Sequence, residues 1–359
     1  MEVEELQKQL VSSLSTMHKS LYVKDFMWSE NEWPKIRHDD YESGDNMPLI
    51  SLLEILDGKR ESEAYENLCK DMVMACESWG FFKLVDHGIP NVVIESMKER
   101  CLGLFDLPME QKLKGERSSN LPLGYSPTNT DYGHNLPWAE SLQLLQSPQQ
   151  VLTFSKKVFG NEHSPFSDAM LDYMHAMDAL GMLIFEMLAH GLGLPHDYFS
   201  KNFEEKEATM IRINRYPPCP LPSKCLGLGS HSDPHTLTIL LQDEVGGLQV
   251  LKKDEEWVGI RPLPNSFIIN VGDTLEAWTN GRLKSVVHRA VVNKEKQRFS
   301  IAYFLSPSSD MVVDSPSQLI DQEKNPKRYL PFTWAQFRRE LIIQKRVTGK
   351  SALKRYTIE

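Results

Sequence analysis

The chain has 359 residues, of which 41% are hydrophobic and 25% are charged, a composition typical of globular proteins. Its formal net charge of −9 argues against a basic nucleic-acid-binding surface, so no nucleic-acid partner is expected. The five cysteines are scattered and form no CxxC pair, which favours a reducing compartment over a disulfide framework.

The N-terminus is acidic and lacks the basic and apolar segments of a signal peptide. The most apolar long stretch is residues 170–194, but Asp172, Asp178 and Glu186 interrupt it. This stretch therefore predicts a buried helix rather than a membrane span. A cytoplasmic location with no membrane partner is expected, and the chain is expected to be a monomer.

Residues 1–205 carry a mixed pattern that is mostly helical. Hydrophobic periodicity predicts, in chain order, a short amphipathic helix near 6–17, a strand at 48–53, a helix at 62–79, a strand at 81–85, a helix at 91–105 and a long helix at 164–192. Residues 114–137 are rich in Gly, Pro, Ser and Asn and are expected to form a loop. Loops of this length in compact domains are often functional.

The pattern becomes β from residue 206 to residue 308. Short strands are predicted at 209–216, 236–241, 246–251, 257–260, 266–271, 285–292 and 299–305. Turn signals such as Gly272-Asp273 and Asn280-Gly281 separate them. Many short strands at near-even spacing indicate a sandwich or jelly roll. Residues 309–359 return to loop and a helix at 333–345, so the predicted fold is a β core surrounded by helices.

Three residues of the β region could form a metal site. If residues 231–233 are extended, the side chains of His231 and Asp233 point the same way. His288, inside the strand at 285–292, would complete a two-His-one-carboxylate face, which is typical of non-haem Fe(II) oxygenases. His235 is the alternative ligand, because it could pair with His231 on a helix. Pro234 and the β-branched residues after it favour a strand instead.

A second group of residues predicts an anion site in the same region. Arg298 and Ser300 share one face of the strand that they open. A buried Arg is costly unless a carboxylate meets it, and its own strand offers none. A bound dicarboxylate is the expected partner, since the planar guanidinium can hold a carboxylate with two hydrogen bonds. Asn214 and Tyr216 share a face of the strand at 209–216 and would contact the same ligand.

Several of these segments resemble the plant 2-oxoglutarate- and Fe(II)-dependent dioxygenase family, and the resemblance covers almost the whole chain. They are residues 75–90 (ACESWGFFKLVDHGIP), 214–219 (NRYPPC), 280–281 and 285–293. The resemblance implies a distorted double-stranded β-helix. It also implies that Fe(II) is bound by His231, Asp233 and His288, and that 2-oxoglutarate is bound by Arg298 and Ser300 with help from Tyr216 and Asn214.

The implied reaction converts 2-oxoglutarate and O2 to succinate and CO2 while a small plant metabolite is hydroxylated or desaturated. Ascorbate is the implied supporting reductant. A member of the fold that binds ligands without turnover is the alternative of another class. The intact ligand set together with Arg298 weighs against that alternative.

Within the family, the sequence is most similar to gibberellin oxidases. Residues 136–141 (LPWAES) resemble the LPWKET segment of gibberellin 20-oxidases, although Ala139 replaces its Lys and Arg215 replaces a Tyr elsewhere. The resemblance implies a gibberellin substrate and leaves the oxidised carbon open. A flavonoid, alkaloid or other specialised metabolite is the alternative. Trp138 is predicted to form a wall of the substrate pocket, unless it is a packing residue beside the loop.

Overall fold

The structure is a computed structural model, and it describes residues 23–41, 46–55, 62–117, 123–128, 135–203, 208–252, 256–344 and 351–358. The amphipathic helix predicted near 6–17 lies outside these ranges. Within them the chain forms two larger β-sheets, a small two-stranded sheet and surrounding helices. This arrangement agrees with the predicted β core inside a helical shell.

The major sheet has eight strands, and neighbouring strands are antiparallel except for the parallel pair at one edge. Their spatial order is β1 (Leu49–Ser51), β2 (Phe81–Val85), β10 (Phe267–Val271), β7 (Leu237–Gln242), β12 (Arg298–Leu305), β5 (Met210–Tyr216), β4 (Glu140–Leu145) and β3 (Gly124–Ser126). The minor sheet has the order β6 (Leu226–His231), β11 (His288–Val291), β8 (Leu248–Leu251) and β9 (Trp257–Gly259). Strands β13 (Val312–Val313) and β14 (Phe332–Thr333) pair separately.

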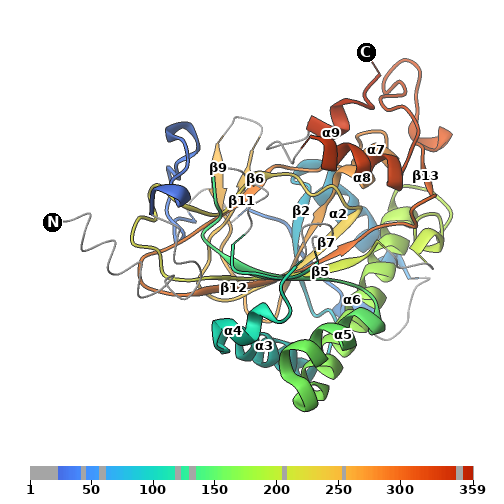
Figure 1. The fold of residues 1–359 in the computed structure, drawn as a ribbon. Coiled ribbons are helices and arrows are strands. Elements are labelled where there is room, and N and C mark those ends of the chain that lie inside the picture. The colour runs from blue at the N-terminus through green and yellow to red at the C-terminus, as the bar shows by residue number, and fades with distance from the viewer. Residues whose placement is uncertain are drawn as a thin grey trace.

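Helices cover one face of the major sheet, and the minor sheet lies on its other side (Figure 1). The covering helices are α3 (Asn91–Asp106), α4 (Met109–Leu113), α5 (Pro148–Phe159) and α6 (Ser164–Gly191). Helix α2 (Glu63–Ser78) begins at Ser62, whose hydroxyl caps the helix by accepting from the backbone N–H of Tyr65. The remaining helices are α7 (Asp273–Trp278), α8 (Trp334–Ile343) and α9 (Ser351–Lys354).

Short 3-10 turns connect several of these elements. They are η1 (Val23–Phe26), η2 (Glu30–Glu32), η3 (Leu53–Ile55), η5 (Gly160–Glu162), η6 (Ser200–Phe203) and η7 (Ser317–Leu319). Among the described helices, none has both the length and the apolar character that crossing a membrane requires. Helix α6 is instead packed into the core, and its residues Met170, Met174, Met177 and Met187 are fully buried.

The two faces of the major sheet differ in chemistry because side chains alternate along each strand. On β5, Ile211 and Ile213 are fully buried in the core that the helices complete. Their neighbours Arg212, Asn214 and Tyr216 line a cavity on the opposite face. The alternation that makes β5 a strand therefore also directs its polar side chains toward the space between the two sheets.

Several described elements were not predicted, and one predicted turn was wrong. Strands β3 and β4 and helix α5 lie where the sequence pattern was weak, β3 inside the expected loop. Gly272-Asp273 is the start of α7 rather than a turn. All six residues of α7 are buried, so it shows no amphipathic pattern.

Strand β6 was also missed, because it contains Gly227 and Gly229, which weaken a strand signal. A Cβ on Gly229 would lie 2.0 Å from the ring of Trp28, so close packing requires glycine there.

A buried charge cluster joins α4, β3, β4 and β5 behind the cavity. The carboxylate of Glu140 is fully buried and accepts hydrogen bonds from Lys112 at 2.8 Å, from the Tyr125 hydroxyl at 2.5 Å and from Arg215. Arg215 is one of the positions where the sequence departs from gibberellin 20-oxidases. Its guanidinium acts here as a partner of a buried acid.

We expect Glu140→Ala to lower the free energy of unfolding by about 3–5 kcal/mol, because it leaves the buried Lys112 ammonium without its anion. Urea denaturation of the full chain measures this change. Glu95→Ala is the matched control, since Glu95 forms an ion pair of the same 2.8 Å length with Lys98 but is 65% exposed. An exposed pair contributes at most about 1 kcal/mol. Equal losses in the two variants would contradict the structural role of Glu140.

Candidate metal centre and adjoining cavity

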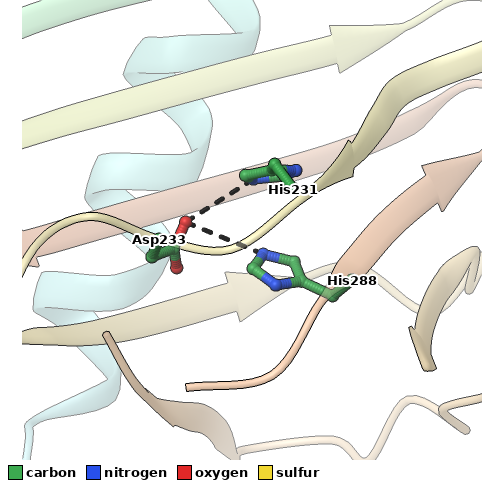
Figure 2. A group of neighbouring side chains, drawn as sticks. All are labelled: His231, Asp233 and His288. Atoms are coloured by element: carbon green, nitrogen blue, oxygen red, sulfur yellow. Dashed lines mark ion pairs between the residues drawn. The ribbon is translucent and has the colours of Figure 1, made fainter. Parts of the chain in front are cut away.

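The structure brings together the three side chains that were predicted to bind a metal. His231 is the last residue of β6, Asp233 follows two residues later, and His288 is the first residue of β11. His231 and His288 are partners across the two antiparallel strands. Their Nε2 atoms lie 3.5 Å and 3.7 Å from Oδ1 of Asp233, and both rings face this carboxylate in Figure 2. The three candidate ligand atoms lie within 4.8 Å of one another.

Asp233 is oriented by two residues of the major sheet. Thr238 on β7 and Asn270 on β10 are cross-strand partners. Oδ2 of Asp233 accepts a hydrogen bond from the Thr238 hydroxyl at 2.7 Å and another from the Asn270 amide at 2.8 Å. Because both bonds use Oδ2, the other oxygen is directed at the histidines. Such supporting contacts are what fix a metal-binding carboxylate in place.

The two imidazoles are held with Nε2 toward the same point. Nδ1 of His231 lies 2.8 Å from the carbonyl oxygen of Gly229, and Nδ1 of His288 lies 3.2 Å from that of Val286. Because a carbonyl only accepts hydrogen bonds, each Nδ1 carries the proton in this assignment. The lone pair of each Nε2 is then available to a cation.

Burial and neighbouring charges set the protonation states of this group. Burial alone raises the pKa of Asp233, but His288, His231 and the Asn270 hydrogen bond outweigh it and hold the pKa well below its usual range. Burial, together with the nearby His231, lowers the pKa of His288 to about 4. One carboxylate and a neutral His288 are the forms that bind a divalent metal, and two His with one carboxylate suit non-haem Fe(II).

The predicted anion site lies at one end of the same cavity. Arg298 is 2% exposed, and its Nη2 donates a hydrogen bond to Gln242 at 3.3 Å. Its guanidinium carbon lies 4.8 Å from the centre of the Tyr216 ring. Within the described ranges, Nε and Nη1 are buried without any hydrogen-bond partner. Two unsatisfied donors on one planar group are what a carboxylate would satisfy, so this end fits 2-oxoglutarate.

The other predicted anion-site residues surround Arg298. Tyr216 is its cross-strand partner, and Asn214 is the partner of Ser300. The Tyr216 hydroxyl and the Asn214 amide each lie 3.5 Å from the Ser300 hydroxyl. All four residues are buried and line the cavity. These positions follow the strand alternation used in the sequence analysis, and the binding roles of the four residues stay predictions.

The same cavity contains a second cation, Arg212, that the sequence analysis left without a role; it pairs with Ala302 on β12, whereas Tyr216 pairs with Arg298. Arg212 is 6% exposed, and among the described residues its guanidinium shows one hydrogen bond, from Nε to Asn214 Oδ1 at 2.9 Å. No ion pair with a described carboxylate is found for it. The surrounding wall is mostly apolar and includes Met210, Ala302, Phe304 and Leu341, with Gln143 as a further polar group. Arg212 and Asn214 share one face of β5, and this alternation could have predicted that Arg212 also lines the cavity.

The packing favours neither Trp138 as a pocket wall nor His235, the alternative that the sequence disfavoured, as a ligand. Trp138 is fully buried; its ring packs edge-on against Phe26 with centroids 5.2 Å apart, and its N–H donates to the Pro217 carbonyl at 3.0 Å. It is not among the described residues that line the cavity, so its contacts fit the packing alternative. His235, the alternative ligand, stacks on Phe304 and is not part of the ligand group.

Comparisons with known proteins agree with a site for Fe(II) and 2-oxoglutarate. A family model described as "2OG-Fe(II) oxygenase superfamily" matches residues 208–307, and one described as "non-haem dioxygenase in morphine synthesis N-terminal" matches residues 47–164. Gibberellin 20 oxidase 1 of Arabidopsis thaliana is 38% identical over 87% of this chain and 82% of that protein. Gibberellin 20 oxidase 1-A of Triticum aestivum is 37% identical over 86% and 84%.

Solved structures with the same fold also match. The crystal structure of JOX2 in complex with 2OG, Fe and JA has a TM-score of 0.78 and 28% identity, covering 99% of this chain and 97% of that one. The structure of a dioxygenase for auxin oxidation in rice has a TM-score of 0.72 and 30% identity, covering 87% and 100%.

Proposed function

The chain belongs to the 2OG-Fe(II) oxygenase superfamily, and from this premise we propose that it oxidises a gibberellin. The observation that carries the proposal is its 35–38% identity to gibberellin 20 oxidases of several plants over most of its length. As a 2-oxoglutarate-dependent oxygenase, it uses Fe(II) and couples substrate oxidation to the conversion of 2-oxoglutarate and O2 to succinate and CO2.

In the proposed site, His231, Asp233 and His288 hold Fe(II), which supplies the O2 chemistry that breaks a substrate C–H bond. Arg298 binds the distal carboxylate of 2-oxoglutarate through Nε and Nη1, for which the described part of the chain offers no hydrogen-bond partner. The hydroxyls of Ser300 and Tyr216, 3.5 Å apart, would contact that carboxylate. The protein's task is then to bind the substrate elsewhere in the same cavity with its C–H bond near the metal.

The part of the cavity around Arg212 supports an acidic, largely apolar substrate. Gibberellins are diterpenoid carboxylic acids, so they offer a hydrocarbon body and a carboxylate. We assign the carboxylate to Arg212 and the hydrocarbon body to the apolar wall that includes Met210 and Phe304. Burying an uncharged ligand against Arg212 would leave the guanidinium without an anion, which is costly.

The test is a panel of substrates incubated with purified protein, Fe(II) and 2-oxoglutarate. Products are analysed by mass spectrometry for the gain of one oxygen atom or the loss of two hydrogen atoms. We expect product with gibberellins and none with flavonoids or alkaloids. Product with flavonoids or alkaloids alone would contradict the proposed substrate class.

A second candidate is the oxidation of another small carboxylic acid. It is favoured by the fold similarity to JOX2 in complex with JA and to the dioxygenase for auxin oxidation. Arg212 would serve either substrate in the same way. The panel therefore includes JA and auxin, and turnover of one of these acids in place of gibberellins would select the second candidate.

We expect Arg212→Gln to raise the KM for the acidic substrate about ten- to one-hundred-fold, because a charge-assisted hydrogen bond contributes about 1.5–3 kcal/mol. The KM for 2-oxoglutarate should stay unchanged, since Arg298 holds it elsewhere. The methyl ester of the substrate is the matched control, because it lacks the charge that Arg212 would bind. If the variant weakened ester and acid equally, the carboxylate assignment of Arg212 would fail.

A further inference from the structure

We propose that Asp273 is a positioning residue of the metal centre, because its carboxylate ties together the two chain segments that carry the candidate ligands. This inference rests on the metal site in the proposed function. Oδ2 of Asp273 accepts a hydrogen bond from Ser232 at 3.0 Å, and Oδ1 accepts one from Ser285 at 2.7 Å. Ser232 lies between His231 and Asp233 in the sequence, and Ser285 precedes His288 by three residues.

The two hydrogen bonds of the Asp273 carboxylate form a bridge between the segments of Ser232 and Ser285. This bridge lies just beyond the end of the pairing between β6 and β11. Strand β6 ends at His231, and β11 begins at His288, where the two strands pair. Residues 232–234 and 284–287 are outside any strand. The ladder between β6 and β11 therefore joins the two histidine segments to each other at only one side. On the other side the carboxylate of Asp273 connects the two irregular segments.

Asp273 is itself held firmly. It is 2% exposed and is the first residue of α7. Its backbone N–H donates to the carbonyl oxygen of Asp233 at 2.7 Å, so the same residue contacts the ligand segment through both main chain and side chain. A Cβ on the preceding Gly272 would lie 1.9 Å from the carbonyl oxygen of His235. Only glycine allows α7 to start so close to the ligand segment.

Helix α7 supplies a second anchor to the other segment. Oε2 of Glu276 accepts a hydrogen bond from the backbone N–H of Ser285 at 2.6 Å, while its Oε1 accepts one from the Tyr329 hydroxyl at 2.9 Å. Ser285 is thus held by its hydroxyl through Asp273 and by its backbone through Glu276. This short helix, absent from the predicted elements, is the platform on which the segment before His288 rests.

The geometry gives Asp273 a role through the ligands rather than as a ligand. It is not part of the group of three side chains whose ligand atoms lie within 4.8 Å of one another. Its two oxygens are used by serine hydroxyls. A metal site gains affinity when its ligands are already in place, because binding then costs less ordering. Supporting contacts around ligands typically contribute about 10- to 100-fold in metal affinity.

The test measures Mn(II) binding to the metal-free full chain by titration calorimetry, without substrate or turnover. We expect Asp273→Ala to weaken Mn(II) binding about 10- to 100-fold. Asp273→Asn, which keeps one oxygen for a serine hydroxyl and has nearly the same shape, should recover part of the affinity. The double variant Ser232→Ala with Ser285→Ala removes the bridge from its other side and should reproduce the Asp273→Ala loss.

Asp178→Ala is the matched control for a general loss of stability. Asp178 is also a buried acid, and it accepts hydrogen bonds from Tyr303 at 2.6 Å and Gln146 at 3.0 Å on the helical side of the sheet. It should lower the melting temperature and leave Mn(II) affinity unchanged. Wild-type affinity in Asp273→Asn, and in Asp273→Ala if that variant folds, would overturn the proposal. An equal loss of affinity in Asp178→Ala would overturn it as well. Absence of Mn(II) binding by the wild-type chain would instead contradict the metal site itself.

Discussion

Replacing Asp233 by alanine is expected to abolish succinate formation from 2-oxoglutarate. The change removes the one anionic group of the candidate ligand set and leaves two imidazoles, which bind a divalent cation much more weakly. It also leaves the Thr238 hydroxyl and the Asn270 amide without their acceptor. Succinate is measured by mass spectrometry after incubation with Fe(II), 2-oxoglutarate and O2.

His235→Gln is the matched control for Asp233→Ala. His235 is buried, lies two residues from Asp233 and was the alternative ligand, but it is outside the ligand group. Mn(II) affinity should therefore survive in His235→Gln and be lost in Asp233→Ala. Wild-type succinate production by Asp233→Ala would show that the metal is held elsewhere.

The second large effect is expected at Arg298. Arg298→Ala should raise the KM for 2-oxoglutarate about 30-fold or more, since losing one partner of a buried, hydrogen-bonded charge pair costs about 2–5 kcal/mol. Arg298→Lys should give an intermediate KM, because lysine keeps the charge but lacks the planar fork. The KM for the oxidised substrate should change little in both variants. A 2-oxoglutarate KM unchanged in Arg298→Ala would exclude its carboxylate role.

The melting temperature of Arg298→Ala distinguishes a role in ligand binding from a role in folding. Among the described residues, the buried Nε and Nη1 of Arg298 have no hydrogen-bond partner. Burying polar donors without hydrogen bonds is costly, so removing them offsets part of the loss of the Gln242 hydrogen bond and of the packing on Tyr216. We therefore expect Arg298→Ala without added ligand to melt close to the wild-type temperature. Added 2-oxoglutarate and Mn(II) should raise the melting temperature of the wild type more than that of the variant.

The parts of the site that sequence alone predicted are those set by strand alternation. A period of two places Asn214 and Tyr216 on one face of β5, whatever the neighbouring strands are. The same rule placed Arg298 beside Ser300. The convergence of His231 and Asp233 on one point was also expected, although β6 ends at His231 and Asp233 lies just beyond it.

The parts that sequence missed depend on packing between distant segments. Asp273 was predicted to lie in a turn, because a six-residue helix whose residues are all buried has no amphipathic pattern. Its hydrogen bonds to Ser232 and Ser285 arise only when β6, α7 and β11 meet. Trp138 read as a pocket wall because it follows a long loop, whereas its contacts with Phe26 and Pro217 place it in a separate hydrophobic cluster.

The most direct test of the combined Fe(II) and 2-oxoglutarate site is an anaerobic titration followed by visible absorption. Fe(II) is added to the purified chain first, and 2-oxoglutarate second. We predict that a metal-to-ligand charge-transfer band develops only after the second addition, that it needs more 2-oxoglutarate in Arg298→Ala, and that it is absent in Asp233→Ala. No band with the wild-type chain at saturating Fe(II) and 2-oxoglutarate would contradict the proposed site.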